Sequence, residues 1–346
     1  MEKNKRHYIR MVMAVVISII LAVGVTGCTG NGGTASGDTD YNIVSDTAFM
    51  LDTTVSVTLY DWEDESTLDK AFDEIDRLDK LLNVNAAGSD LEKLYLAAGK
   101  DYTEVSEDTL YVISTSLKYS ELSGGLFDIT AGPFISLWNI KDGSGHIPTA
   151  EELEEVLPLI DYKKILINGN KVMLQEPGMK ANLGAIAKGY IADKVKEVLI
   201  NEGVEHAIIN LGGNVVTIGG KPEGNPFKIG IQDPFEGTGD IIATLEVDNM
   251  SLVSSGSYER YFEENGVRYH HILDPTTGFP SDSGLAGITI ISEKSIDGDA
   301  LSTSVFLLGL DAGKELIESL DGVEAVFITE AGDIIVTPGL EGKLIQ

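Results

Sequence analysis

One stretch of the sequence places two oxygen-bearing side chains at helical spacing. In SIDGDALSTSVFLLG, residues 295–309, Asp299 and Thr303 are four residues apart, so both would project from one face of a helix. A carboxylate and a hydroxyl are hard oxygen ligands that suit Mg²⁺, which usually also binds water and substrate phosphate oxygens. The structural alternative is that Asp297 or Asp299 complements the helix dipole while Thr303 is a buried hydroxyl. Spacing alone favours that alternative.

Two adjacent histidines form a second candidate site, in YHHILDPTTGFP, residues 269–280. His270 and His271 fall in a predicted strand and therefore face opposite ways, so they cannot both serve one site. One could be a general base, because imidazole titrates near neutral pH. The other would lie at the surface or in a satisfied hydrogen bond. Without further information, a structural role is favoured for both.

Three further segments combine small residues with a polar or aromatic group. In SGGLFDITAGP, residues 123–133, a flat ligand could approach the glycines, stack on Phe127 and donate N–H bonds to Asp128. The residues alone favour the alternative, a glycine-rich turn with Phe127 in the core. Lys188 could meet an anion at the start of a helix, although a lysine is most often a solvated surface charge. SSGSYERYF, residues 254–262, offers hydroxyls near Tyr258 and Arg260, or is another turn at a strand end.

The secondary structure around these groups follows from periodicity and capping. Alternation predicts a strand over 53–60, and apolar spacing predicts helices over 66–82, 106–122 and about 184–202. Further strands are predicted at 206–210, 214–219, 227–231, 241–247, 251–254, 267–273, 286–292, 323–328 and 333–336, with helices at 295–308 and 311–320. LGGNVVTIGG, residues 211–220, lacks nucleotide-loop spacing and predicts a hairpin. Because no regular βαβ rhythm is present, we expect an α+β fold of mixed helices and largely antiparallel sheets.

The N-terminal region resembles a lipoprotein signal. Four basic residues precede an apolar run over 11–25, and Val-Thr-Gly leads directly to Cys28, the only cysteine of the chain. We expect residues 1–27 to be a signal peptide, 28–45 a lipidated cysteine with a flexible tether rich in Gly, Ser, Thr and Asp, and 46–340 the folded domain. An uncleaved transmembrane anchor is the alternative, but the apolar run is short for a span. The expected location is the bacterial cell membrane, lipid-anchored and facing the extracytoplasmic side.

The charge of the chain limits its partners. The formal net charge is −30, and removal of residues 1–27, with one acid and four bases, would leave −33. Such a surface repels nucleic-acid phosphates, so no nucleic-acid role is expected. An anionic ligand would need a local metal ion or backbone N–H groups.

Taken together and in order, the segments resemble the ApbE family of FAD:protein FMN transferases. The matching pieces, spread over nearly all of residues 46–339, are Met50-Leu51-Asp52-Thr53, GGLFDITAGPFISLW, NLGAIAKGYIAD, INLGGNV, IGIQDP, SSGSYERYF, HHILDPTTGFP and DGDALSTSVFLLG. Each piece is weak alone, but the ordered set is specific and outweighs the structural alternatives.

The resemblance implies an ApbE/T-fold-like domain that binds FAD extended, with its pyrophosphate on Mg²⁺. Family metal ligands fall on the Ala185 carbonyl, Asp299 and Thr303, and the family histidine falls on His271, not His270. Flavin and adenine contacts fall on Met50, Leu126, Phe127, Asp128, Asn182, Lys188 and Leu273. A loop residue that is often aromatic in relatives is Asn85 here, a departure that would weaken adenine stacking and favour FAD hydrolysis.

The implied reaction is attack by an acceptor threonine hydroxyl on the FMN-side phosphorus of FAD, with His271 taking the proton and AMP leaving. Implied acceptors are extracytoplasmic flavoproteins, such as subunits of redox-driven ion pumps, with a short Asp…Ser/Thr-Ala/Gly-Thr segment. Two alternatives stay open. One is an Mg²⁺-dependent FAD pyrophosphatase that releases FMN and AMP; the other is a flavin-binding lipoprotein without catalysis.

Overall fold

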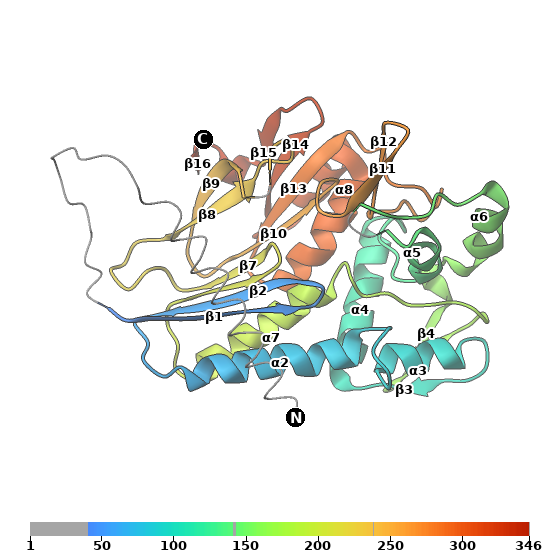
Figure 1. Ribbon diagram of the computed structural model, residues 1–346, viewed down its shortest axis with the longest axis horizontal. Coiled ribbons are helices and arrows are strands. Elements are labelled where there is room, and N and C mark those ends of the chain that lie inside the picture. Colours follow the sequence, from blue (N-terminus) through green and yellow to red (C-terminus); the bar gives the residue numbers. More distant parts are fainter. Residues whose placement is uncertain (1–40, 141–142, 238, 346) are drawn as a thin grey trace.

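The centre of the protein is an eight-stranded antiparallel sheet, seen in the computed structural model, which describes residues 41–140, 143–237 and 239–345 (Figure 1). The strand order is β1-β2-β6-β7-β10-β13-β14-β15, and every neighbouring pair is antiparallel. Their bounds are β1 Ile43–Met50, β2 Thr53–Tyr60, β6 Ala207–Leu211, β7 Asn214–Ile218, β10 Ser251–Gly256, β13 Leu285–Ser292, β14 Glu324–Thr329 and β15 Ile334–Val336. The expected α+β class with largely antiparallel sheets is confirmed.

Both faces of the central sheet are covered. Along β14 the side chains alternate: Ala325 and Phe327 belong to the main core, whereas Val326 and Ile328 belong to a second core on the other face. The main core includes helices α2 (Ser66–Leu82), α7 (Ala187–Asn201) and α8 (Ser295–Glu318). The second core includes a small sheet of β8 (Phe227–Gln232), β9 (Ile241–Val247) and β16 (Leu344–Ile345). Burial on both faces explains why all eight residues of β13 are buried.

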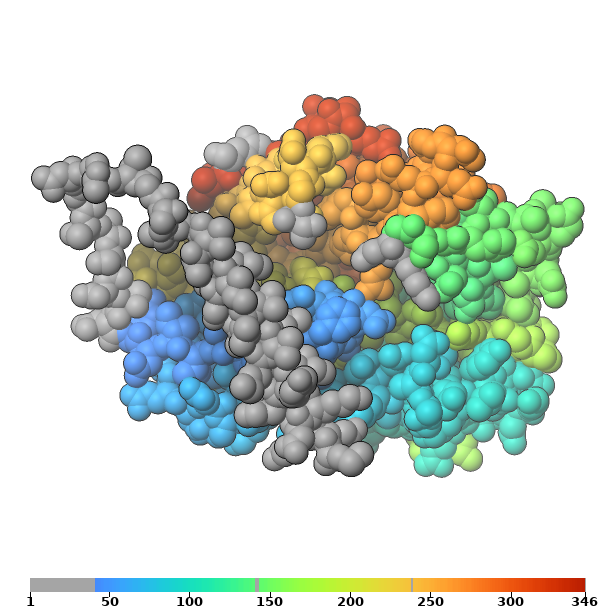
Figure 2. Space-filling model, in the orientation of Figure 1, coloured from blue at the N-terminus to red at the C-terminus, as the bar shows by residue number. Residues whose placement is uncertain are grey.

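The remaining elements extend the molecule beside the helix layer (Figure 1). They are α3 Asp90–Ala97, β3 Thr103–Glu104, α4 Glu107–Leu122, α5 Gly132–Trp138, α6 Ala150–Val156, β4 Ile165–Asn168, β5 Lys171–Leu174, β11 Tyr261–Glu264, β12 Val267–His270 and short 3₁₀ turns at Leu157–Leu159, Tyr162–Lys164 and Pro338–Leu340. A third apolar cluster, which includes Trp138, Phe262 and Leu273, joins α5 and α6 to the β11–β12 hairpin. The blue β1–β2 region and the orange segment near residue 260 share one face in Figure 2.

Most predicted elements are present, with differences at their ends. The helix predicted from 184 begins at Ala187, and the strand predicted over 267–273 ends at His270. The break predicted between 308 and 311 is Gly309, whose φ of 77° interrupts α8. The first described strand, β1, starts at Ile43, before the expected boundary at 46. The predicted signal peptide and Cys28 lie outside the described residues. Within the described part of the chain, no helix is long and apolar enough to cross a membrane.

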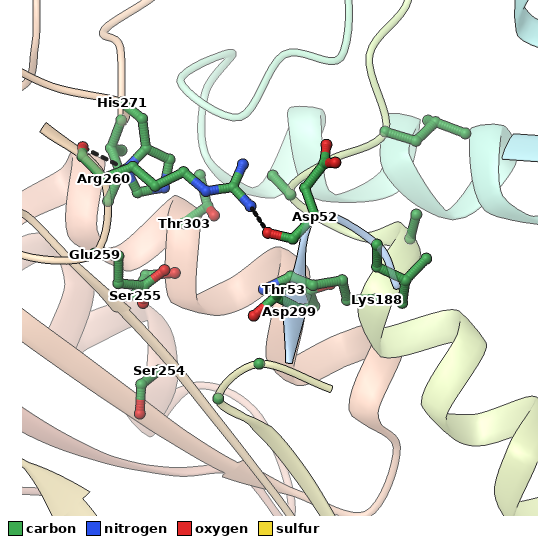
Figure 3. Close-up of a pocket in the computed structure, with 18 of the residues that line it drawn as sticks. Asp52, Thr53, Lys188, Ser254, Ser255, Glu259, Arg260, His271, Asp299 and Thr303 are labelled. Atoms are coloured by element: carbon green, nitrogen blue, oxygen red, sulfur yellow. Dashed lines mark hydrogen bonds between the residues drawn. The ribbon is translucent and has the colours of Figure 1, made fainter. Parts of the chain in front are cut away.

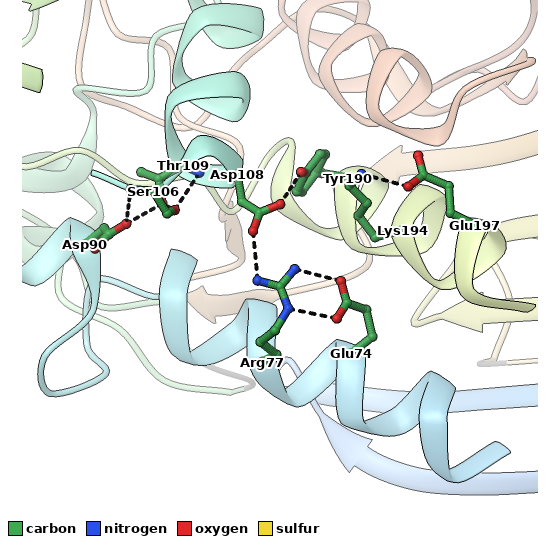
Figure 4. A network of polar contacts seen from close by, with 9 residues as sticks. All are labelled: Glu74, Arg77, Asp90, Ser106, Asp108, Thr109, Tyr190, Lys194 and Glu197. Atoms are coloured by element: carbon green, nitrogen blue, oxygen red, sulfur yellow. Dashed lines mark hydrogen bonds and ion pairs between the residues drawn. The ribbon is translucent and has the colours of Figure 1, made fainter. Parts of the chain in front are cut away.

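Ion pairs and a hydrogen bond link the helices α2, α4 and α7. Arg77 of α2 pairs with Glu74 at 2.7 Å and with Asp108 of α4 at 2.8 Å. Asp108 also accepts a hydrogen bond from the Tyr190 hydroxyl of α7 at 2.5 Å (Figure 4). Three helices that are distant in sequence therefore meet at one carboxylate.

Helices α7 and α8 approach so closely that only glycine fits between them. A Cβ on Gly189 would lie 2.2 Å from the Ser295 carbonyl oxygen and 2.7 Å from the Asp299 Cβ. One turn later, the Asp193 carboxylate accepts the N–H groups of Ser295 at 2.8 Å and Ile296 at 3.0 Å, at the start of α8. Burial raises the pKa of Asp193 to about 6, although these N–H groups act in the opposite direction. The first turn of α8 is thus fixed against the first turns of α7.

This contact predicts that Gly189→Ala destabilises the protein. The added methyl group has no space beside the Ser295 carbonyl, so we expect a loss of about 1–3 kcal/mol in the free energy of unfolding, measured by urea denaturation. Asn201→Ala, at the exposed end of α7, is the control and should change stability by less than about 0.5 kcal/mol. Equal stability of the two variants would mean that the helices separate without cost.

Candidate active site

One large cavity collects most of the residues singled out in the sequence. Its volume is about 1040 Å³, just above the roughly 300–1,000 Å³ typical of small-molecule sites. The wall is formed by the β1–β2 turn, the loops around 126–131 and 182–187, the start of α7, the segment 254–260 and one face of α8. Figure 3 shows how side chains from these separate segments converge.

The predicted carboxylate–hydroxyl pair lies on the cavity side of α8. Asp299 and Thr303 both line the cavity, as does Ala185. Asp299 is only 4% exposed, and its Oδ2 accepts the Gly189 N–H at 2.8 Å. Burial raises the pKa of Asp299, while the Lys188 charge, the Gly189 N–H and the Asn214 side chain lower it. The site is therefore a nearly enclosed carboxylate with a cation beside it.

These residues fit a magnesium ion that shares its coordination with a substrate. A carboxylate, a hydroxyl and a main-chain carbonyl would supply only hard oxygen ligands. Among the described residues, no group of three or more His, Cys, Asp or Glu side chains could hold a metal ion. A cation held by the Asp299 carboxylate, the Thr303 hydroxyl and the Ala185 carbonyl would have octahedral positions left for water and phosphate oxygens, which is the usual mode of Mg²⁺ binding to phosphate substrates.

The two histidines have different surroundings. His270 is buried, with its Nε2 3.0 Å from the Ser281 carbonyl and its Nδ1 3.3 Å from the Ile272 N–H. Because the carbonyl can only accept and the N–H can only donate, both ring nitrogens are satisfied. Burial lowers the pKa of His270, so its ring stays neutral. His270 therefore has a structural role.

His271 follows the strand and lines the cavity. Its Nδ1 lies 3.3 Å from the Arg260 carbonyl, which also accepts the His271 main-chain N–H at 3.0 Å. Since that carbonyl can only accept, Nδ1 carries the proton and Nε2 keeps its lone pair. Desolvation by the cavity walls lowers the pKa of His271 to about 3, with help from the charges of Arg260 and Lys188. The ring is thus a neutral proton acceptor.

Phe127 and Asp128 follow the structural alternative that the residues alone favoured, a glycine-rich turn with Phe127 in the core. Phe127 is only 2% exposed and lies in the core, edge-on to Tyr119 at 6.5 Å, so its ring is not an open stacking platform. Asp128 uses its carboxylate internally: Oδ1 accepts from the Thr130 N–H and hydroxyl, and Oδ2 accepts from the Tyr162 N–H. Phe127 and Asp128 both line the cavity, and both shape its wall.

The remaining predicted residues divide into those that line the cavity and one that does not. Asn85, Leu126, Asn182, Lys188 and Leu273 line it. Asn182 accepts the Gly184 N–H at 2.8 Å through its Oδ1, which shapes the turn before α7. Met50, at the end of β1, is not among the lining residues; Leu51 next to it is.

Sequence reasoning did not single out Glu259. This residue lines the cavity beside Arg260 (Figure 3). Its side chain is open to the cavity space, yet desolvation by the surrounding walls raises the pKa of Glu259 to about 7. The charges of Lys188 and Arg260 lower that pKa, and the Asp299 charge raises it. The only signal for Glu259 in the sequence was its position in SSGSYERYF. The position of this segment relative to α8 depends on the packing of the sheet, which the local sequence does not encode.

Comparisons with known proteins agree with one another. The model of the ApbE family matches residues 51–327. A protein from Klebsiella pneumoniae described as an FAD:protein FMN transferase is 37% identical over 86% of this chain and 93% of its own length. One from Treponema pallidum with the same description is 34% identical over 77% and 78%. The crystal structure of an ApbE protein from Thermotoga maritima superposes with a TM-score of 0.79, at 30% identity over 87% of this chain and 99% of that one.

Proposed function

This chain belongs to the ApbE family, and we propose that it is an Mg²⁺-dependent enzyme that transfers FMN from FAD to a threonine hydroxyl of acceptor proteins. One observation carries the proposal: a single cavity is lined by the neutral imidazole of His271, the cation of Lys188 and the Asp299–Thr303 pair. These are the groups that a phosphoryl transfer needs for proton transfer and charge stabilisation. The family relatives described as FAD:protein FMN transferases support the choice of substrates.

One group of residues would neutralise the negative charge of the substrate. Asp299, Thr303 and the Ala185 carbonyl would hold the metal ion, which supplies charge neutralisation and polarisation of the phosphoryl group. Lys188 adds positive charge beside Asp299.

The proton of the acceptor would be handled by His271. The acceptor hydroxyl oxygen forms a bond to the FMN-side phosphorus, the bond from that phosphorus to the bridging oxygen breaks, and AMP leaves with the electron pair. His271 Nε2 takes the hydroxyl proton, because Nδ1–H is held by the Arg260 carbonyl.

Hydrolysis of FAD is the second candidate function, and Asn85 favours it. This exposed side chain lines the cavity, where it offers no aromatic face for adenine. With water in place of the acceptor hydroxyl, the same groups would release FMN and AMP. Incubation with FAD, Mg²⁺ and an acceptor peptide separates the two reactions. A covalent mass gain on the peptide indicates transfer, and free FMN without it indicates hydrolysis.

We also propose that the enzyme is anchored by lipid on Cys28 to the outer side of the bacterial cell membrane. The basic, apolar and small-residue pattern before Cys28 supports this location. Acceptors would then be extracytoplasmic electron carriers, including subunits of redox-driven ion pumps. Holding enzyme and acceptor at one membrane raises their effective concentration.

Asp299→Asn tests the metal site. The amide keeps the size of the side chain but loses the carboxylate charge, so we expect Mg²⁺-dependent FMN transfer to fall by about 100-fold or more, measured by mass spectrometry of the peptide. Asp297→Asn is the matched control, since Asp297 is two residues away, accepts from the Tyr119 hydroxyl and does not line the cavity. Undiminished transfer by Asp299→Asn would remove Asp299 from the site.

The histidine assignment predicts opposite outcomes at neighbouring positions. His271→Ala should reduce FMN transfer by about 10²–10⁴-fold, the usual contribution of a general base, while FAD still binds as judged by flavin fluorescence. His270→Ala should instead lower the melting temperature, because it leaves the partly buried Ser281 carbonyl and the buried Ile272 N–H without their His270 partners. A selective loss of transfer in the His270 variant, with His271→Ala fully active, would reverse the assignment.

Cys28→Ser tests the membrane anchor. The variant should accumulate without lipid, outside the membrane fraction or as unprocessed precursor, and should transfer FMN to a soluble peptide at the wild-type rate. Intact-mass analysis of both proteins from the same cells checks this. Diacylglycerol on the serine variant would show that Cys28 is not the lipidated residue.

A further inference from the structure

Among the described residues, three cations line the cavity, and they differ in their partners. Lys228 pairs with a carboxylate of β9 at 3.4 Å, and Lys188 donates to the Asn214 Oδ1 at 3.2 Å. Arg260 donates to a main-chain oxygen, the Asp52 carbonyl, at 3.3 Å. No carboxylate of the described segments forms an ion pair with Arg260, in a chain with 55 acidic and 25 basic residues.

The main chain of Arg260 is fixed beside the proposed general base. Its carbonyl accepts both the main-chain N–H and the ring Nδ1 of His271. The guanidinium charge also lowers the pKa of His271, as does Lys188, so both cations act on the ring that would take the hydroxyl proton. In Figure 3 the Arg260 side chain extends from beside His271 toward Asp52, with Thr303 close to it in the view.

The contact with Asp52 is one that a ligand can replace. Asp52 lies at the tip of the β1–β2 hairpin, where Leu51 and Asp52 both have a φ of 55°. A single neutral acceptor at 3.3 Å uses one of the five N–H donors of the guanidinium. A phosphate can accept two parallel N–H bonds from the same fork, and such charge-assisted pairs are shorter and about twice as strong.

The charged residues that line the cavity show why the Arg260 guanidinium is important for binding an anion. The carboxylates that line the cavity are those of Asp52, Asp79, Asp128, Asp240, Glu259 and Asp299. A dinucleotide that carries negative phosphates meets these carboxylates as it enters. Lys188 and Arg260 supply positive charge near Glu259 and His271, and of these two only Arg260 can bind a phosphate in bidentate geometry.

We propose that Arg260 is a substrate-binding residue whose guanidinium leaves the Asp52 carbonyl and binds the phosphate oxygens of the dinucleotide. This inference rests on the proposed function. It makes Arg260 specific for the pyrophosphate portion of the ligand, whereas the isoalloxazine ring is bound elsewhere in the cavity. It also places a second cation, besides the metal ion, on the phosphates next to His271.

The test compares ligands with and without phosphates. Wild type, Arg260→Gln and Arg260→Lys are titrated with FAD, ADP and riboflavin in the presence of Mg²⁺, by flavin fluorescence and calorimetry. Arg260→Gln should bind FAD and ADP about 10- to 100-fold more weakly, as expected for loss of a charge-assisted pair, and bind riboflavin as wild type does. Arg260→Lys should lie between, because lysine keeps the charge but loses the fork.

The matched control is Arg268→Gln. Arg268 is on β12, pairs with Glu263 at 3.4 Å and does not line the cavity, so the substitution removes the same net charge from the surface. It should leave all three affinities unchanged. An equal loss of ADP affinity in the Arg268 variant would mean that the net charge of the protein explains the effect, and it would overturn the proposal.

Failure of this inference is distinct from failure of the proposed function. Wild-type FAD affinity retained within about twofold in Arg260→Gln would overturn the role of Arg260, even if FMN transfer is confirmed. A parallel loss of riboflavin affinity would also overturn it, since Arg260 would then support the shape of the cavity. A selective loss of FAD and ADP affinity, in a protein that transfers no FMN, would support Arg260 and reject the transferase activity alone.

Discussion

The close contact between α7 and α8 at Gly189 organises the site. The Gly189 N–H donates to Asp299, and the missing side chain lets the two helices approach until this 2.8 Å bond can form. Lys188 and Asp299 are thereby brought to one wall of the cavity. Asp193 holds the start of α8 through two further N–H groups. A bulkier residue at position 189 would move the Asp299 carboxylate away from the Lys188 ammonium group.

In a strongly acidic protein, an anionic dinucleotide can bind only where local positive charge offsets the overall negative charge. The net charge of −30 acts against any phosphate that approaches. The cavity contains a buried carboxylate suited to a divalent cation, together with Lys188 and Arg260. Because these charges lie in a partly enclosed space of lower dielectric constant, they act more strongly than the distant surface acids, which salt screens.

Adjacent residues can have unrelated roles when the backbone changes direction between them. His270 ends β12 and has both ring nitrogens satisfied by main-chain groups. His271 lies beyond the strand, and the Arg260 carbonyl holds one of its nitrogens while the other keeps its lone pair. Hydrogen-bond direction thus separates a ring with both nitrogens occupied from a ring with one free lone pair. The lowered pKa of each ring follows chiefly from its desolvation.

Local signals in the sequence were enough to predict many of the helices and strands. The helices over 66–82 and 106–122 and the hairpin turn at Gly212 and Gly213 were all predictable, because periodicity, capping and turn chemistry depend on near neighbours. Helix α6 was missed although Thr149 and Glu152 form a capping box that the sequence displays. The Asp299–Thr303 pair was also visible, since four residues complete about one helical turn.

Which of these groups meet was settled by long-range packing. Arg260 reaches Asp52 across 208 positions of the chain, and Gly189 reaches Asp299 across 110. The same packing put Phe127 in the core and satisfied the Asp128 carboxylate internally. The physical reason is that contacts between distant segments form when whole sheets and helices associate. This association buries the apolar area of many residues at once, and no local sequence pattern encodes the total area buried.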